Sequence, residues 1–222
     1  MILAAGRGER MRPLTDTCPK PLLQAGGKPL IAWHLEALAA AGFREVVINH
    51  AHLGALLERA LGDGARWGMR IAWSPENPAL ETAGGIAHAL PLLGSEPFLV
   101  INGDVFCDFP LARARTIAAQ MQAARLLAWC VLVPNPPHHP DGDFALAGGL
   151  LDAGRRSLTF SGIGVYRPEL FAGLDPDAPA RLAPLLREAA ARGRVGAELH
   201  DGRWIDVGTP ERLAAVDAQL RR

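Results

Sequence analysis

The chain opens with an apolar stretch that leads directly into a loop rich in glycine and arginine. Residues 1–5 predict a short β-strand, and glycines follow it at positions 6 and 8. Because glycine carries no side chain to keep a ligand away from the backbone, the N–H groups of such a loop can point at a phosphate. The start of the chain therefore predicts a polyphosphate-binding turn at the end of the first strand.

Four cations gather in this region although the formal net charge of the chain is zero. Arg7, Arg10, Arg12 and Lys20 stand against the nearby acids Glu9 and Asp16. Such a local excess suits a polyphosphate better than it suits a solvated surface. No basic stripe stands out elsewhere, which argues against a nucleic-acid partner.

Apolar runs alternate with helical patterns, which predicts a three-layer αβα fold with a mostly parallel, Rossmann-like sheet. The predicted strands are 1–5, 46–49, 69–73, 98–101 and 128–133, and the predicted helices are 29–41, 53–61, 84–90, 111–124, 180–191 and 210–220. Residues 144–147 and 150–152 predict a hairpin around Gly148-Gly149, with 158–166 as a further strand. We expect these three strands beside the main sheet, as a small β-rich lobe over the cleft.

At 222 residues the chain is long enough for one sizeable core, and we expect a single domain. Its expected parts are 1–134, a lobe at 135–209 and a closing helix at 210–222. The three cysteines, Cys18, Cys107 and Cys130, match no metal or disulfide spacing. No apolar run approaches the length of a membrane span, and Met1 leads directly into the first strand. We expect a reducing cytoplasm, no membrane partner, and a monomer or weak dimer.

Two acids follow apolar runs in separate parts of the chain. Asp104 stands just past the predicted strand 98–101, where an open α/β sheet places its ligand-binding groups. Asp206 follows Trp204 and Ile205 near the far end of the sequence. If the fold brings the two together, they offer the hard oxygen ligands that Mg²⁺ prefers.

Five motifs together resemble the sugar-1-phosphate nucleotidyltransferases, and they span nearly the whole chain. They are Leu3-Ala4-Ala5-Gly6-x-Gly8-x-Arg10-Met11-x-Pro13-Leu14-Thr15, Pro19-Lys20-Pro21-Leu22, Leu80-Glu81-Thr82-Ala83-Gly84-Gly85, Asn102-Gly103-Asp104-Val105 and Trp204-Ile205-Asp206-Val207-Gly208-Thr209-Pro210. The resemblance implies the nucleotide-diphospho-sugar transferase type of fold. It also implies a Mg²⁺-dependent reaction in which a nucleoside triphosphate and a sugar 1-phosphate give a nucleotide sugar and pyrophosphate.

The resemblance also implies a role for each matching residue. Catalytic roles fall to Arg10, Lys20 and Asp104, metal binding to Asp104 and Asp206, nucleotide binding to Ala5, Gly6, Arg7, Gly8, Lys20, Glu76, Glu81, Thr82 and Gly85, and substrate binding to Asn102 and Asp143. Arg10 is expected to stabilise the departing pyrophosphate. Lys20, between two prolines that stiffen its backbone, is expected to act on the phosphates as a point charge.

The base and the sugar are specified less directly. Glu81 replaces a glycine that many relatives carry, and this favours a branch that uses UTP and N-acetylmuramic acid α-1-phosphate in peptidoglycan recycling. Guanylyl transfer to mannose 1-phosphate, and UTP or dTTP with glucose or N-acetylglucosamine 1-phosphate, stay open. A non-catalytic nucleotide-binding regulatory module is disfavoured, because Arg10, Lys20, Asp104 and Asp206 are all present.

Other chemistries fit the sequence less well. A Rossmann dehydrogenase would need a third glycine after Gly6-x-Gly8, and the P-loop pattern is absent. In the turn-rich segment 135–143, adjacent His138 and His139 do not have the spacing of a zinc site. That segment folds over the sugar, with Asp143 on a hydroxyl or amide, or forms an exposed turn. Arg155 and Arg156 are candidate partners of the sugar phosphate, and His50 and His52 are expected to be structural.

Overall fold

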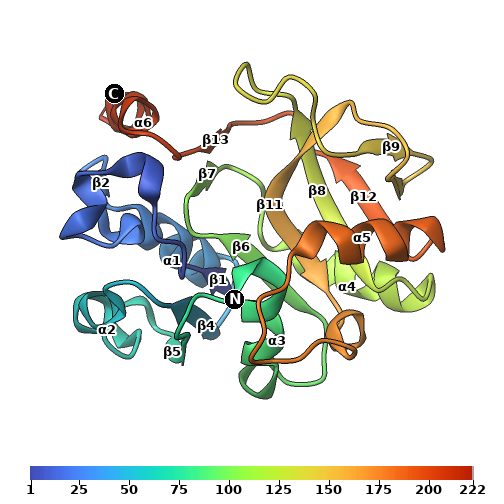
Figure 1. Ribbon diagram of the computed structural model, residues 1–222, viewed down its shortest axis with the longest axis horizontal. Helices are drawn as coiled ribbons and strands as arrows, with labels where there is room; N and C mark the ends of the chain where they lie inside the picture. Colours follow the sequence, from blue (N-terminus) through green and yellow to red (C-terminus); the bar gives the residue numbers. More distant parts are fainter. Residues whose placement is uncertain (222) are drawn as a thin grey trace.

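The computed structural model describes residues 1–221 and contains a large mixed sheet between two layers of helices (Figure 1). The sheet has nine strands in the order β5-β4-β1-β6-β11-β8-β12-β10-β9. Its first half, β5 (Arg70–Pro75), β4 (Glu45–His50), β1 (Ile2–Leu3) and β6 (Phe98–Asn102), is parallel. In its second half, β11 (Leu158–Tyr166) runs antiparallel to β6 and to β8 (Ala128–Pro134), and β12 (Val195–Leu199) runs parallel to β8. The hairpin of β9 (Ala145–Ala147) and β10 (Leu150–Asp152) forms the edge.

Alternating side chains of the strands build a separate core on each face of the sheet. Along β6, Leu99 and Ile101 pack with α1 (Leu30–Ala40), α2 (Gly54–Leu61) and α4 (Arg113–Ala123). Phe98 and Val100 pack with α3 (Glu81–Leu93) and α5 (Leu182–Ala191). This period of two places the helical layers on opposite faces. Within residues 1–221, no helix is long and apolar enough to cross a bilayer.

A third, smaller core joins the two ends of the described chain. Val216 of α6 (Pro210–Leu220) packs against Met11 and Leu30. The antiparallel ribbon of β7 (Val105–Cys107) and β13 (Trp204–Asp206) lies beside this core. The remaining short elements are β2 (Gln24–Ala25), β3 (Lys28–Pro29) and the 3₁₀ turns η1 (Glu9–Met11), η2 (Leu14–Asp16), η3 (Lys20–Leu22), η4 (Ala65–Trp67) and η5 (Pro168–Phe171). The C-terminal helix α6 therefore lies beside β2, as Figure 1 shows, and its Val216 packs with Met11 of the N-terminal loop.

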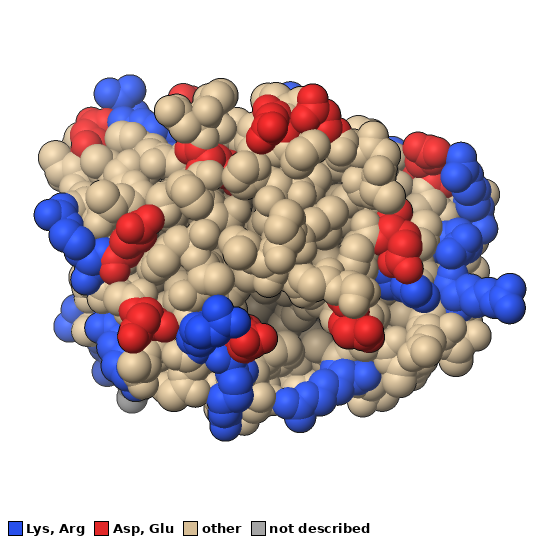
Figure 2. Space-filling model, turned by 90° about the horizontal axis from the view of Figure 1, so that it is seen from below, with Lys and Arg blue, Asp and Glu red and all other residues tan. Residues whose placement is uncertain are grey.

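The face seen from below in Figure 2 lies away from α6 and β13. Lys and Arg alternate with Asp and Glu around its edge, and uncharged residues cover its centre. The two signs of charge are thus interspersed over the described residues of this face, in keeping with a chain of zero net charge.

The fold class predicted from the sequence is confirmed, and the predicted strands and helices are present with shifted ends. Helix α3 is longer than the predicted 84–90, because Pro91 lies near the helix end rather than terminating it. The expectation that 158–166 lies beside the main sheet is wrong, since β11 occupies its middle. Strands β2, β3, β7, β12 and β13 were not predicted. Arg222, the end of the predicted closing segment, lies outside the described residues.

One buried histidine connects α1 to the ribbon. His34 is 8% exposed, and burial lowers the pKa of its imidazole to about 4. The charge of Asp104 and a hydrogen bond with the Val105 backbone raise that pKa in part. The buried amino group of Met1, which donates to the Leu99 carbonyl at 2.6 Å, has its pKa lowered by burial to about 5. Both groups are therefore better proton acceptors in the unfolded chain.

We predict that the free energy of unfolding falls as the pH is lowered from 6.5 to about 4. Over this range His34 binds a proton in the unfolded chain but stays neutral in the folded chain, which favours the unfolded state. A depression from 6.5 to about 4 corresponds to a contribution of roughly 3 kcal/mol at most. Urea denaturation at pH 7 and at pH 4.5 gives the free energy of unfolding at each pH. The decrease between the two pH values should be smaller for His34→Gln than for the wild type, and Met1 is the same in both proteins. An equal decrease in the free energy of unfolding in the two proteins would show that His34 does not cause this pH dependence.

Candidate active site

A cleft of about 540 Å³ opens at the carboxyl ends of β1 and β6. Ligands of open α/β sheets bind at this edge. Of the residues predicted to form a site, Ala5, Gly6, Gly8, Arg10, Lys20, Glu76, Glu81, Thr82, Asn102 and Asp104 line the cleft. Arg7, Gly85, Asp143 and Asp206 are not among its lining residues, although Gly208, two residues after Asp206 in the chain, is.

Glycine occupies positions 6 and 8 of the loop for different physical reasons. Gly8 has φ +68°, and a Cβ there would lie 3.0 Å from Thr15 Cγ2, so the fold itself requires glycine. A Cβ on Gly6 would meet no protein atom within 4 Å. The space beside the Gly6 backbone is therefore open.

Arg7 points away from the cleft and braces the loop. Its guanidinium donates to the Thr15 carbonyl at 2.6 Å and to Asp16 at 2.8 Å. The hydrogen bond from Arg7, together with Arg12 at 2.9 Å, lowers the pKa of the Asp16 carboxyl. Thr15 in turn donates from its hydroxyl to the Gly8 carbonyl at 2.9 Å. These contacts fix the turn that carries Gly6 and Gly8.

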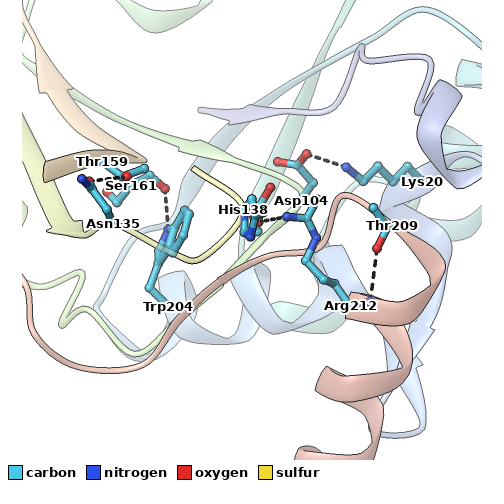
Figure 3. A network of polar contacts seen from close by, with 10 residues as sticks. Lys20, Asp104, Asn135, His138, Thr159, Ser161, Trp204, Thr209 and Arg212 are labelled. Carbon is cyan, nitrogen blue, oxygen red and sulfur yellow. Dashed lines mark hydrogen bonds and ion pairs between the residues drawn. The ribbon is translucent and has the colours of Figure 1, made fainter. Parts of the chain in front are cut away.

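Lys20 and Asp104 form an ion pair across the cleft (Figure 3). Lys20 Nζ lies 2.5 Å from Asp104 Oδ2, and the lysine side chain is only 10% exposed. Its backbone begins η3 and follows Pro19, which directs the side chain inward. A nearly buried ammonium needs a partner of opposite charge, and Asp104 provides it in the absence of a ligand.

The β7–β13 ribbon places Asp206 beside Asp104. Asp206 is paired in register with Val105, and the Val207 N–H donates to the Asp104 carbonyl at 2.7 Å. The two acids, more than a hundred residues apart in the sequence, are thus brought together by backbone hydrogen bonds. This is the juxtaposition on which the predicted metal site depends.

Asp206 is surrounded by positively charged and hydrogen-bonding groups. Its Oδ1 accepts a hydrogen bond from Arg212 Nη1 at 2.8 Å and lies 2.9 Å from His138 Nε2; Figure 3 shows the Arg212 and His138 side chains. A Cβ on Gly208 would overlap the Arg212 guanidinium and lie 3.0 Å from Arg10 Nη2. Gly208 therefore leaves room for the ends of the Arg10 and Arg212 side chains, and Arg212 reaches the Asp206 carboxylate.

A second group of contacts shapes the opposite end of the cleft. Asn49 Nδ2 donates to Glu76 Oε1 at 2.6 Å, and the Leu80 N–H donates to Glu76 Oε2 at 2.8 Å. Asn49 Oδ1 also accepts from the Ala4 N–H at 2.8 Å. A Cβ on Gly85 would lie 2.8 Å from Asn49 Nδ2 and would overlap Glu76. Glu76 is thus a buried brace between the first strand and the start of α3.

Glu81, the first residue of α3, has φ +61°. A residue with a Cβ is disfavoured in this left-handed region by roughly 1–2 kcal/mol. Glycine, the residue that many relatives carry here, would adopt it without strain. The strained backbone turns the half-exposed Glu81 side chain toward the cleft, 3.9 Å from Arg181 Nε.

The segment 135–143 is held on β11. Asp143 Oδ2 accepts from the Phe160 N–H at 2.9 Å, and its Oδ1 lies 3.1 Å from His139 Nε2. Both oxygens of Asp143, a predicted sugar ligand, therefore contact protein groups. Arg155 pairs with Asp152 at 2.8 Å on the surface of the lobe.

Two residues that contact Asp206 were not predicted from the sequence as site residues. Arg212 lies in the first turn of α6, where the Thr209 hydroxyl caps the helix by accepting from the Arg212 N–H at 3.4 Å. Its place directly after the Trp-x-Asp-x-Gly-Thr-Pro motif was an available signal. His138 was considered only for zinc, for the sugar side or for an exposed turn, because its contact with Asp206 joins residues far apart in the chain.

The fold and the cleft define an α/β protein with Arg10, Lys20 and Asp104 in a cleft at the carboxyl edge of its sheet. Residues 1–142 match the family profile described as "Nucleotidyl transferase". The chain is 56% identical to the N-acetylmuramate alpha-1-phosphate uridylyltransferase of Neisseria meningitidis over 98% of this chain and 96% of that one. It is 38% identical to the enzyme of the same name from Caulobacter vibrioides, over 99% and 96%. The chain belongs to the nucleotidyl transferase family.

The fold agrees with this assignment. A crystal structure from Bacillus anthracis, described as a glucose-1-phosphate thymidylyltransferase in complex with sucrose, aligns with a TM-score of 0.85 at 21% identity. The alignment covers 99% of this chain and 94% of that one. The α/β scaffold is thus common to chains whose sequences differ at most positions.

We predict that Gly208→Ala lowers turnover about tenfold or more while changing stability by less than about 1 kcal/mol. The new Cβ displaces the ends of the Arg10 and Arg212 side chains, which can move, rather than backbone. Gly173→Ala is the matched control, because a Cβ there meets nothing within 4 Å. Steady-state kinetics and thermal melting of both variants test this, and unchanged turnover in Gly208→Ala would contradict it.

Proposed function

We propose that the chain transfers a uridylyl group from UTP to N-acetylmuramic acid α-1-phosphate, giving UDP-N-acetylmuramic acid and pyrophosphate. The observation that carries the proposal is full-length similarity to two uridylyltransferases of that name, together with a cleft that holds the expected charged groups. Peptidoglycan recycling in the cytoplasm is the corresponding process and compartment. No observation favours GTP with mannose 1-phosphate, dTTP, or a non-catalytic role.

The reaction needs charge stabilisation more than covalent catalysis. The attacking phosphate is largely ionised at neutral pH, with a second pKa of about 6, so no general base is required. The barrier lies in bringing two anions together and in stabilising the leaving pyrophosphate. The loop 5–8 would bind the triphosphate through its backbone N–H groups, with Arg7 bracing the turn. Arg10 would oppose the charge that grows on pyrophosphate, and Lys20 would contact the phosphates.

Asp104 and Asp206 fit a magnesium ion. They are two carboxylates on neighbouring backbone strands, and hard oxygen donors are what Mg²⁺ binds. Bound there, Mg²⁺ would neutralise charge on the phosphate oxygens. Lys20 and Arg212 now lie against these carboxylates and would become available to the phosphate oxygens of the substrates.

The remaining residues would bind the base and the sugar. The turn held by Glu76 and Gly85 places Glu81 and Thr82 on the cleft wall, where the base would lie. Asn102 lines the cleft beside Asp104 and is our candidate for a neutral sugar contact. We propose that residues 1–134 bind the nucleotide and that 135–209 bind the sugar phosphate, with Asp143 fixing the segment that covers it.

A pyrophosphate-release assay of four nucleoside triphosphates against a panel of sugar 1-phosphates tests the proposal. We expect UTP with N-acetylmuramic acid α-1-phosphate to give the highest kcat/KM. The sugar carries a lactyl carboxylate, so N-acetylglucosamine 1-phosphate is the matched comparison. Equal or better kcat/KM with N-acetylglucosamine, glucose or mannose 1-phosphate would reject the muramate assignment while keeping the family.

Replacement of either acid should separate catalysis from folding. Asp104→Asn and Asp206→Asn are each expected to lower turnover by at least about a hundredfold, because removal of a group that stabilises transition-state charge has effects of this order. Both variants are expected to stay folded at the assay temperature, with a lower melting temperature than the wild type because Lys20 or Arg212 loses its charged partner. Magnesium titrations provide the second measurement. Wild-type turnover and metal dependence in Asp104→Asn would refute its assignment as a ligand.

A further inference from the structure

A group of metal-ligating side chains lies at the far end of the β7–β13 ribbon from the two cleft acids. Cys107, Asp108 and His200 each offer one donor atom, and these three atoms lie within 4.8 Å of one another. Cys107 ends β7 and is paired with the first residue of β13, whereas Asp206 is the last residue of β13. Among the residues that the structure describes, no other three His, Cys, Asp or Glu side chains converge in this way.

Backbone contacts fix the two chain segments that carry these side chains. The His200 N–H donates to the Leu132 carbonyl of β8 at 2.8 Å, and the Asp108 N–H donates to the Arg203 carbonyl at 3.1 Å. Gly202 lies in the turn between β12 and β13, and a Cβ there would be 2.4 Å from Asp108 Oδ1 and 2.5 Å from His200 Cε1. Glycine at this position therefore leaves the room in which the two side chains meet.

Neighbouring groups orient the donor atoms. Cys107 Sγ accepts a hydrogen bond from the Phe109 N–H at 3.4 Å, a contact that also favours a thiolate. The His200 ring packs edge-on against the Phe109 ring, with 5.6 Å between the centroids, and its Nε2 lies 2.8 Å from Asp108 Oδ1. Contacts of this kind around metal ligands set the orientation of the ligands.

The group is accessible from solvent on the side of Asp108. The Asp108 side chain is 39% exposed, whereas the His200 side chain is 13% exposed. Arg203 Nε lies 3.4 Å from Asp108 Oδ2, but the arginine side chain is 68% exposed, so this ion pair is weak and can open. A cation can therefore reach the three donors, and water can complete its coordination.

The donor set determines which cation fits. A thiolate, an imidazole and a carboxylate are ligands of Zn²⁺, which binds three protein groups and a water in tetrahedral sites. Mg²⁺ prefers an octahedron of hard oxygen donors, so sulfur and nitrogen donors disfavour it. Burial raises the pKa of the Cys107 thiol to about 11, so the thiol is protonated near neutral pH and coordination would release its proton to solvent.

We propose that Cys107, Asp108 and His200 form a Zn²⁺ site that joins the end of β7 to the turn before β13. The ion would hold together the two segments that lead into the ribbon. None of the three residues lines the cleft, so the inference does not depend on which nucleotide or sugar the enzyme uses.

Titration of the full-length protein with Zn²⁺, and with Co²⁺ as a coloured substitute, tests the site. The protein is first dialysed against a chelator, and excess Mg²⁺ is then added to compete for Asp104 and Asp206. We expect one Zn²⁺ per chain and a Co²⁺ complex with the charge-transfer absorption of a thiolate ligand. Because the donors converge only in the folded chain, Zn²⁺ should also raise the melting temperature.

Replacement of two ligands and of two neighbouring groups locates the bound ion. Cys107→Ser and His200→Gln should each weaken Zn²⁺ binding at least about a hundredfold, because loss even of an outer contact costs about 10–100-fold. Cys107→Ser should also abolish the charge-transfer absorption. Asp201→Asn, an exposed acid beside His200, and Cys18→Ala, another partly buried thiol, are the matched controls and should bind Zn²⁺ as the wild type does. Melting without added Zn²⁺ shows that each variant is folded.

Two results would overturn the inference. One is the absence of saturable Zn²⁺ binding by the folded wild type. The other is unchanged Zn²⁺ affinity in either Cys107→Ser or His200→Gln, since the ion would then occupy other groups of the protein.

Discussion

Backbone pairing between β7 and β13 is the constraint on which the cleft depends. It joins Val105 to Asp206 and donates the Val207 N–H to the Asp104 carbonyl, so the backbones of the two acids lie side by side. Closing a loop of this length costs conformational entropy that grows only slowly with length, and the sheet offsets it. β11 returns the chain beside β6, and Trp204 Nε1 donates to the Ser161 carbonyl at 2.8 Å. The ribbon is therefore attached to the centre of the sheet.

The same ribbon allows the protein to fold with charged groups at a partly buried site. Lys20 is paired with Asp104, and Arg212 and His138 contact Asp206. An unpaired charge in such surroundings would be strongly unfavourable. In the Lys20–Asp104 and Arg212–Asp206 pairs, a cationic side chain suited to a phosphate contacts a carboxylate suited to a metal ion. The cationic side chains of the cleft region are therefore matched by carboxylates of the same chain.

The sequence predicted most of the fold and many of the residues that line the cleft, because the signals for these are local. Gly6, Gly8, Lys20 and Asp104 lie in short motifs at the ends of predicted elements, and all four line the cleft. The position of β11 could not be predicted, because an apolar strand fits the middle of a sheet as well as a lobe beside it. Propensity identifies a strand, whereas strand order depends on tertiary packing.

The surroundings of Asp206 depend on contacts that no motif contains. Arg212 reaches Asp206 because Gly208 leaves room and Thr209 starts the helix there, and His138 reaches it because 135–143 is anchored on β11. Each contact requires the positions of two or three elements at once. Backbone groups in one turn can bind the phosphates common to all nucleotides, but a particular sugar must be recognised by side chains that converge from separate elements. The chemistry that the family shares is therefore apparent in the sequence, whereas the groups that would discriminate one sugar from another become visible only in the folded chain.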